Sequence, residues 1–374
     1  MGSETETETE TETAANCRRQ PKGAPATTTT VSMTGHAQAG QSRYTPVFPE
    51  RVPQTYGIRA TFGIDLGVEE DDQGQPKLDK AGGQILKERE VNGYSDCDPM
   101  WVPKIDPDYV FPVEETKAIL LGMEARDRIL IVGETGTGKT SVLEQIAARL
   151  NYNVVKLSFD GGITRHDLVG EWVVKGTEMV FNYGILPLGM RMPGTIIILD
   201  EWDTISGDCS FVLQRPLQKE DGKLLMMETG GEIIPLHESN LIAATANTAG
   251  QGDDTGLYSH GTKVQNYAQL NRFSNTIRLG YMPEDKEKEM IQKRFPELDD
   301  TEVGSLVRAV NIIREGYQKG DLSAPLSTRD LINWAEKYLM MGEPLRAAKY
   351  AFLNRMPPED SETAIGLIQR SFED

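Results

Sequence analysis

The chain has 374 residues, of which 38% are hydrophobic, and this is enough to form one large core with a second small domain. No apolar run approaches the ~18 residues that a membrane helix needs, and the N-terminus lacks the apolar segment of a signal peptide, so we expect a cytoplasmic protein without membrane contact. The net charge of −18 disfavours binding to nucleic-acid backbones over a broad surface.

Residues 1–55 form a polar, threonine-rich segment that opens with alternating threonine and glutamate. Such a segment buries too little apolar surface to offset its chain entropy, so it is predicted to be a disordered tail. Residues 56–105 carry mixed signals, because 62–65 has the composition of an ordered segment whereas 69–75 is acidic and typical of a loop. We therefore expect a small N-terminal extension over 56–105.

Residues 106–282 alternate short apolar runs with helical or loop segments. The runs are typical of strands buried on both faces, and they lie at 128–132, 154–159, 195–199, 241–245 and 276–279. Residues 140–150 place their apolar side chains on one helical face. Strands that alternate with helices predict an α/β domain, in which helices cover both faces of a parallel sheet.

After Pro283 the pattern becomes helical. Periodic segments lie at 284–294, 303–317, 328–341 and 345–354. Residues 283–374 are therefore predicted to form a separate, small α-helical lid domain.

The first chemical motif is a phosphate-binding loop that fits G-x-x-x-x-G-K-[ST]. It reads Gly133-Glu134-Thr135-Gly136-Thr137-Gly138-Lys139-Thr140 and is followed by Ser141. Its glycines allow backbone N–H groups to surround phosphate oxygens, and the following helix directs its positive end toward them. We expect Lys139 to reach the β- and γ-phosphates of ATP and Thr140 to bind Mg²⁺.

Two carboxylates follow the apolar run at 195–199. Asp200 and Glu201 would stand at the carboxyl end of that strand, where parallel sheets bind their ligands. Asp200 is predicted to assist Thr140 at the Mg²⁺ site, and Glu201 to orient the attacking water as a base. The three cysteines and four histidines are scattered and support neither a zinc site nor a disulfide framework.

Three further polar residues are candidates for the ATP site. Asn247 ends the next apolar strand and could hold the attacking water or the γ-phosphate. Arg329 opens a lid helix, from where it could reach back to the γ-phosphate of its own subunit. Arg272 precedes the last strand. For both arginines, a surface ion pair is the alternative interpretation.

From about residue 62 onward the chain resembles the CobS-type ATPase subunits of aerobic cobaltochelatase, within the MoxR branch of the AAA+ ATPases. The resemblance rests on Phe62-Gly63-Ile64-Asp65, the two motifs above, Ile185-Leu186-Pro187, the run at 244–262, Asn271-Arg272-Phe273 and residues 326–334. The run at 244–262 is more specific than the phosphate-binding loop, because nucleotide chemistry does not require it.

The resemblance implies a homo-oligomer, a hexameric ring in which Arg272 faces the phosphates of a neighbouring subunit. It also implies two partners, a CobT-like protein with a von Willebrand domain and a large chelatase subunit, which together use ATP to drive Co²⁺ into a corrin ring. β-Hairpins are expected on the same basis at 168–183 and 223–236.

Two other functions stay open. A MoxR-type chaperone ATPase without a chelatase role would share every motif. A phage-type nucleic-acid motor would need basic pore residues, whereas the expected hairpins carry a mixed set of charges: Lys175, Glu178, Lys223, Glu228 and Glu232.

Overall fold

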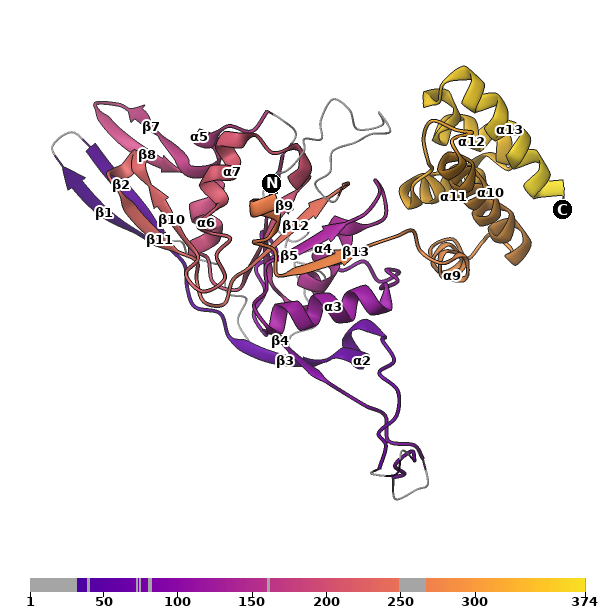
Figure 1. Cartoon of the computed structure of the whole chain (residues 1–374), viewed down its shortest axis with the longest axis horizontal. Coiled ribbons are helices and arrows are strands. Elements are labelled where there is room, and N and C mark those ends of the chain that lie inside the picture. The colour runs from indigo at the N-terminus through magenta and orange to yellow at the C-terminus, as the bar shows by residue number, and fades with distance from the viewer. Residues whose placement is uncertain are drawn as a thin grey trace, which may run out of the picture.

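The computed structural model describes residues 32–38, 41–71, 73, 75–79, 83–159, 162–248 and 267–373 (Figure 1). Its centre is a five-stranded sheet in the order β13-β5-β12-β9-β6. The strands are β5 (Ile129–Val132), β6 (Asn153–Ser158), β9 (Thr195–Asp200), β12 (Leu241–Ala246) and β13 (Asn275–Arg278). Every pairing is parallel, so all five carboxyl ends meet at one edge. The five predicted strands are confirmed, each end within one residue of its predicted position.

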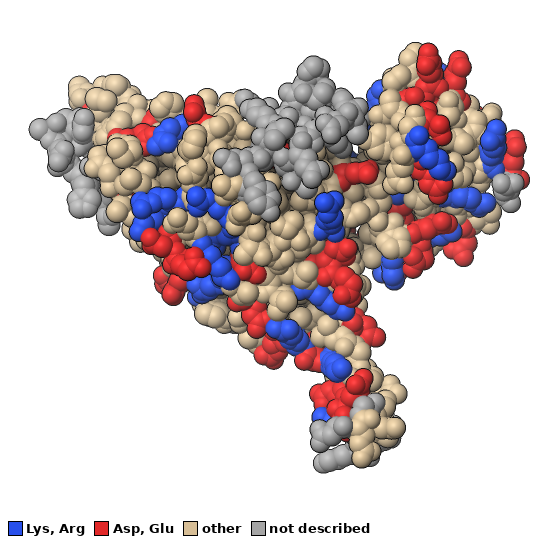
Figure 2. Space-filling model, in the orientation of Figure 1, with Lys and Arg blue, Asp and Glu red and all other residues tan. Residues whose placement is uncertain are grey.

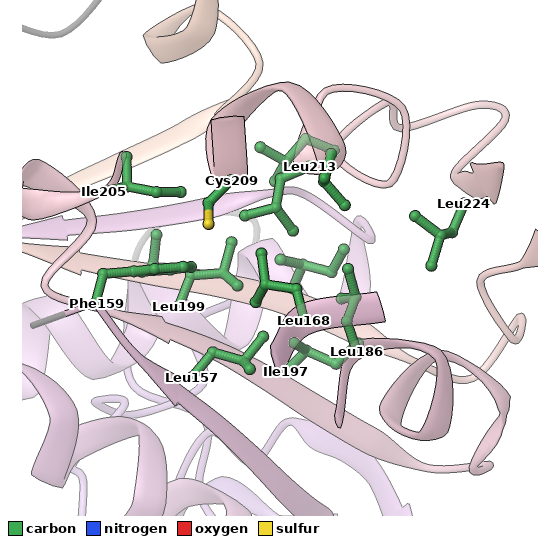
Figure 3. Close-up of a cluster of buried hydrophobic side chains, with 14 of the residues drawn as sticks. Leu157, Phe159, Leu168, Leu186, Ile197, Leu199, Ile205, Cys209, Leu213 and Leu224 are labelled. Atoms are coloured by element: carbon green, nitrogen blue, oxygen red, sulfur yellow. The ribbon is translucent and has the colours of Figure 1, made fainter. Parts of the chain in front are cut away.

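Alternate residues of the central strands point to opposite faces of this sheet. Leu130 and Val132 of β5 belong to a hydrophobic cluster on one face, whereas Ile129 and Ile131 belong to the cluster on the other. The first face is covered by α5 (Arg165–Val169), α6 (Ile185–Arg191) and α7 (Gly207–Leu213), the second by α3 (Val113–Glu124) and α4 (Lys139–Leu150). In Figure 3 the Cys209 thiol lies among the leucine and isoleucine side chains of the first cluster. Burial on both faces explains why the strands are continuously apolar.

The C-terminal helices form the predicted lid around a third hydrophobic cluster. They are α9 (Glu284–Arg294), α10 (Asp300–Lys319), α11 (Thr328–Met341), α12 (Pro344–Ala351) and α13 (Pro358–Glu373), of which α13 was not predicted. Trp334 and Phe352 are buried there and pack edge to face, with ring centroids 5.4 Å apart. Ser327 begins α11 through a capping box with Asp330, which fixes the position of the helix start.

Both predicted hairpins are confirmed. Strands β7 (Gly170–Lys175) and β8 (Glu178–Tyr183) pair antiparallel, and so do β10 (Lys223–Met226) and β11 (Glu232–Pro235). Gly230 and Gly231 both have positive φ angles in the turn of the second hairpin. Glycine suits these positions because other residues are strained there.

The prediction of a disordered tail over residues 1–55 is wrong for the second half of this range. That half contains β1 (Ser32–Gln38), β2 (Gln41–Val47) and the start of β3 (Pro53–Gly57), while residues 1–31 lie outside the described part. Strand β2 pairs with β1 on one side and with β8 on the other. Main-chain pairing with a strand far along the chain therefore orders a segment whose polar composition alone does not predict a strand.

The N-terminal extension packs on the face of the sheet that α3 and α4 cover. Strand β3 pairs antiparallel with β4 (Glu90–Tyr94), and α2 (Ile58–Phe62) follows β3. Tyr56, Phe62 and Tyr94 join the hydrophobic cluster of that face. The described residues of the acidic loop predicted at 69–75 lie in an arm with isolated bridges such as Val68↔Leu86, and this arm projects from the body in Figure 1.

Cys97 is disulfide-bonded, which the scattered cysteines did not predict, whereas Cys209 is a buried free thiol. Among the described helices, none combines the length and the apolar character that crossing a bilayer requires.

Candidate functional site

The phosphate-binding loop connects β5 to α4 at the carboxyl edge of the sheet. Gly136 and Gly138 have φ angles of +79° and +91°, which other residues adopt only with strain. A Cβ atom on Gly133 would lie 2.1 Å from the Leu279 carbonyl oxygen, and one on Gly136 would lie 2.0 Å from the Ser327 Cβ atom. The loop is therefore packed between the residue that follows β13 and the N-cap residue of the lid helix α11. Gly138 is the N-cap of α4, and no side chain caps the helix there. The first N–H groups of the helix have no partner within it, and they point toward the loop.

Lys139 is buried in this loop, with 9% of its surface exposed. Its ammonium donates to the carbonyl oxygens of Gly133 and Glu134, both at 2.8 Å, and to Oδ1 of Asn247 at 3.0 Å. Burial lowers the pKa of Lys139 to about 8. The carboxylates around it act in the opposite direction, and they are those of Asp203, Asp200, Glu201 and Glu134.

Thr140 and Asp200 lie together as oxygen donors. The Thr140 hydroxyl donates to Oδ1 of Asp200 at 2.7 Å, and the hydroxyl of Thr245 donates to the same oxygen. Mg²⁺ prefers such oxygen ligands and needs only one or two from the protein when a nucleotide supplies phosphate oxygens. The residues therefore fit Mg²⁺ bound together with ATP, as the sequence predicted for this pair.

Glu201 directly follows β9 and turns the chain sharply there. Its φ angle is +56°, and its N–H donates to the Thr245 hydroxyl at 3.2 Å. The residue is exposed, and it lines one pocket together with Lys139, Thr140 and Asn247. This position gives a carboxylate access to a water molecule next to bound phosphates.

Asp203 is a residue of this site that the sequence analysis missed. It is fully buried in the turn after β9, and its Oδ2 accepts from the N–H groups of Asn247 at 2.9 Å and Thr248 at 3.0 Å. It therefore fixes the backbone at Asn247, the residue after β12, to the turn that follows Glu201. The signal in the sequence was a third acidic residue soon after Asp200 and Glu201, which a surface turn would explain equally well.

The lid closes a second pocket over the phosphate-binding loop. Arg329, exposed at the start of α11, lines this pocket as well as the one around Lys139 and Glu201. Its wall contains apolar side chains from three separate segments, namely Tyr109, Val110, Met282, Met290 and Ile332. Apolar side chains beside a phosphate-binding loop, in a pocket that also contains polar side chains such as Gln145, suit a nucleotide base. No local motif marks these residues, so the sequence analysis did not identify them.

Thirteen predicted residues line three adjoining pockets at this edge, namely Gly133, Glu134, Thr135, Gly136, Thr137, Gly138, Lys139, Thr140, Ser141, Asp200, Glu201, Asn247 and Arg329. Arg272 is the exception. It precedes β13, whose first residue Asn275 is in register with Ile129 at the start of β5, whereas the phosphate-binding loop follows the end of β5. Arg272 therefore lies at the opposite edge of the sheet, where it donates to the Gln214 carbonyl oxygen at 2.8 Å.

Comparisons with known proteins agree with this geometry. The AAA domain of the dynein-related subfamily matches residues 128–258, and the CbbQ/NirQ/NorQ C-terminal domain matches residues 287–369. The chain is 38% identical over 326 residues to the aerobic cobaltochelatase subunit CobS of Sinorhizobium sp., which covers 85% of this chain and 90% of that protein. This chain belongs to the MoxR/CobS branch of the AAA+ ATPases.

This AAA+ ATPase also shows weaker similarities, one to a protein sequence and one to a solved structure. It is 28% identical over 265 residues to the protein NorQ of Paracoccus denitrificans, covering 70% of this chain and 92% of NorQ. A solved structure of the RuvB branch migration motor of Thermotoga maritima aligns with a TM-score of 0.41 at 14% identity, over 72% of each chain. The segment at 249–266, which contains most of the family-specific run, lies outside the described residues.

The pKa of Lys139 predicts a pH dependence of nucleotide binding in this AAA+ ATPase. Phosphate binding needs the charged ammonium, so affinity should fall by about tenfold per pH unit above the pKa of Lys139 near 8, and stay constant below it. The measurement is a set of fluorescent-ADP titrations across this pH range. Lys139→Arg keeps its charge there, so its affinity, although weaker, should not change with pH. A fall of equal steepness in Lys139→Arg would contradict the assignment.

Asp203→Asn should weaken the connection between Asn247 and the turn after Glu201 while both of these residues stay in place. The neutral amide is a weaker acceptor for the two N–H groups, so we expect kcat to fall about tenfold or more and the free energy of unfolding to fall by about 1–3 kcal/mol. Steady-state ATPase assays and denaturant unfolding measure the two effects. Asp208→Asn, the same change at an exposed position of α7, is the matched control. Equal kcat values for the two variants would contradict the role of Asp203.

Proposed function

We propose that this AAA+ ATPase binds ATP with Mg²⁺ between its core and lid and hydrolyses the bond that joins the γ-phosphate to the rest of ATP. The observation that carries the proposal is the chain of contacts at the sheet edge, in which Lys139, Asn247 and Asp203 connect the phosphate-binding loop, the end of β12 and the turn after Glu201. Each group in it has a chemical task in phosphoryl transfer. The base of ATP would lie against the apolar side chains of the pocket that the lid closes.

The residues divide the reaction among them. The N–H groups of the loop and the Lys139 ammonium would hold the β- and γ-phosphates, and Thr140 with Asp200 would hold Mg²⁺. When bound, Mg²⁺ would supply positive charge beside the phosphate oxygens. Glu201 orients the attacking water and accepts its proton, while Asn247 positions that water or the γ-phosphate.

The two arginines would act on opposite sides of a subunit boundary. Arg329 reaches the γ-phosphate of its own chain from the lid, because it lines the same pocket as the phosphate-binding loop. Arg272 precedes β13 and so lies at the opposite edge of the sheet, where it cannot do the same. It would complete the site of a neighbouring copy in a homo-oligomeric ring, which we propose to be a hexamer, and such an arginine contributes roughly 10³–10⁵ in rate in related chemistry.

We place this activity in a cobaltochelatase-type complex of the cytoplasm. The similarity to CobS over 90% of that protein supports a CobT-like von Willebrand-domain partner and a large chelatase subunit, with Co²⁺ as the metal to be inserted. The similarity to NorQ and the CbbQ/NirQ/NorQ C-terminal match favour a second candidate, a MoxR-type ATPase that remodels a partner without a chelatase. A nucleic-acid motor has less support, because the face in Figure 2 mixes acidic and basic side chains.

Glu201→Gln should produce an ATP-trapped form of the chain. We expect nucleotide affinity close to that of the wild type and a kcat lower by about 10²–10⁴, since the amide cannot accept the proton. Purified from host extract with ATP, this form should retain the von Willebrand-domain protein and the large chelatase subunit, as mass spectrometry would show. The von Willebrand-domain protein alone, or unrelated clients, would support the remodelling function instead. The same purification without ATP is the control.

Mixing two inactive variants tests the role of Arg272 in a neighbouring site. Arg272→Ala and Lys139→Ala should each lack activity. A mixed ring places an intact Arg272 beside an intact phosphate-binding loop at roughly a quarter of its boundaries, so about that share of the activity should return. Energy transfer between labelled subunits verifies that the rings are mixed. Mixed rings that stay inactive would show that Arg272 does not act across the boundary.

A further inference from the structure

Tyr281 lies in the segment that joins the last core strand, β13, to the first lid helix, α9. Its hydroxyl donates to the carbonyl oxygen of Thr135 in the phosphate-binding loop at 3.2 Å. Its ring packs against the guanidinium of Arg314 on α10, with the Arg314 Cζ atom 4.0 Å from the ring centroid. One side chain therefore contacts the nucleotide site on one side and the lid on the other.

Arg314 makes the lid side of this contact rigid. Its side chain is 5% exposed and binds both carboxylate oxygens of Glu287, which is fully buried on α9, at 2.8 and 3.0 Å. Its Nε donates to the Leu326 carbonyl oxygen at 2.8 Å, and Glu287 also accepts from the Thr328 hydroxyl at 3.1 Å. A buried ion pair with this many hydrogen bonds holds its partners in one geometry. It fixes α9, α10 and the start of α11 to one another, directly before Arg329.

Thr135 makes the core side of this contact sensitive to the nucleotide. Its hydroxyl donates to Oδ1 of Asn247 at 3.3 Å, and this oxygen also accepts from the Lys139 ammonium at 3.0 Å. Phosphate groups that bind Lys139 would compete with the Asn247 amide oxygen for its ammonium. Any resulting shift of the loop at Thr135 moves the acceptor of the Tyr281 hydroxyl.

We propose that Tyr281 is a positioning residue that transmits the conformation of the phosphate-binding loop to the lid, and so sets where Arg329 stands. This rests on the proposed ATPase function, in which Arg329 reaches the γ-phosphate. Tyr281 borders the pocket that Gly133, Thr137 and Asn247 line, and it is not among the residues that line the pocket around Lys139, Thr140 and Glu201. In the proposal it acts through its contacts with Thr135 and Arg314. Its hydroxyl carries the loop contact, and its ring carries the lid contact.

The two contacts can be separated by substitution. Tyr281→Phe keeps the ring on Arg314 and removes the donor to Thr135, whereas Tyr281→Leu removes both. Tyr338→Phe is the matched control, since the Tyr338 hydroxyl donates to Glu302 at 2.8 Å within the lid, away from the loop. All three variants are made in the full chain.

The test compares catalysis with movement of the lid. We expect Tyr281→Phe to lower kcat by about 2–10-fold, the loss of one hydrogen bond, with little change in the affinity for fluorescent ADP. Hydrogen exchange at 314–330 with saturating ATP, in a Glu201→Gln background, should show protection that Tyr281→Phe reduces and Tyr281→Leu reduces further. Tyr338→Phe should match the wild type in both measurements.

Two results would overturn the proposal. One is wild-type kcat and wild-type lid protection in Tyr281→Phe. The other is unchanged lid protection with affinity and kcat lowered together, which would restrict Tyr281 to a local role in the loop. A wild-type chain that binds ATP without hydrolysing it would contradict the proposed function, but protection of the lid by ATP would still test the coupling.

Discussion

The structure depends on keeping a lysine charged while it is buried. An ammonium removed from water costs several kcal/mol unless acceptors and opposite charges surround it. The main-chain carbonyls of the loop and the amide oxygen of Asn247 supply the acceptors around Lys139, and Asp200, Glu201 and Asp203 supply the charges. The residues that would act on phosphate are therefore also the ones that make the burial of Lys139 tolerable.

The order of strands explains how such distant residues come together. Strand β5 lies between β12 and β13, and β9 is next to β12, so the loop after β5 is flanked by the ends of strands from two later parts of the chain. Because every pairing is parallel, Asp200 and Asn247 reach the same edge as Lys139. The same rule places Arg272 at the opposite edge, since it precedes its strand. One topological constraint thus accounts both for the assembled site and for the residue absent from it.

The parts of the fold that could be predicted are those with local signals. Continuous apolar runs such as 196–199 require burial on two faces, and the glycine spacing of the loop follows from its backbone conformation. Asp203 and Tyr281 could not be assigned, because their partners are backbone groups that only the folded chain brings near. Strands β1 and β2 were missed for a related reason, since their ordering depends on pairing with β8 rather than on their own composition.

The nucleotide site does not encode the choice of partner. CobS and NorQ are both relatives of this chain, and the chemistry of Lys139 and Glu201 suits either type of ATPase. The exposed apolar side chains of Val174 and Met227 lie instead on or next to the two hairpins, on the α5–α7 side of the sheet. Since β2 pairs with β8 there, it extends the sheet of the first hairpin. The hairpins present exposed apolar side chains apart from the residues that would act on phosphate, so a partner-binding surface is to be sought there.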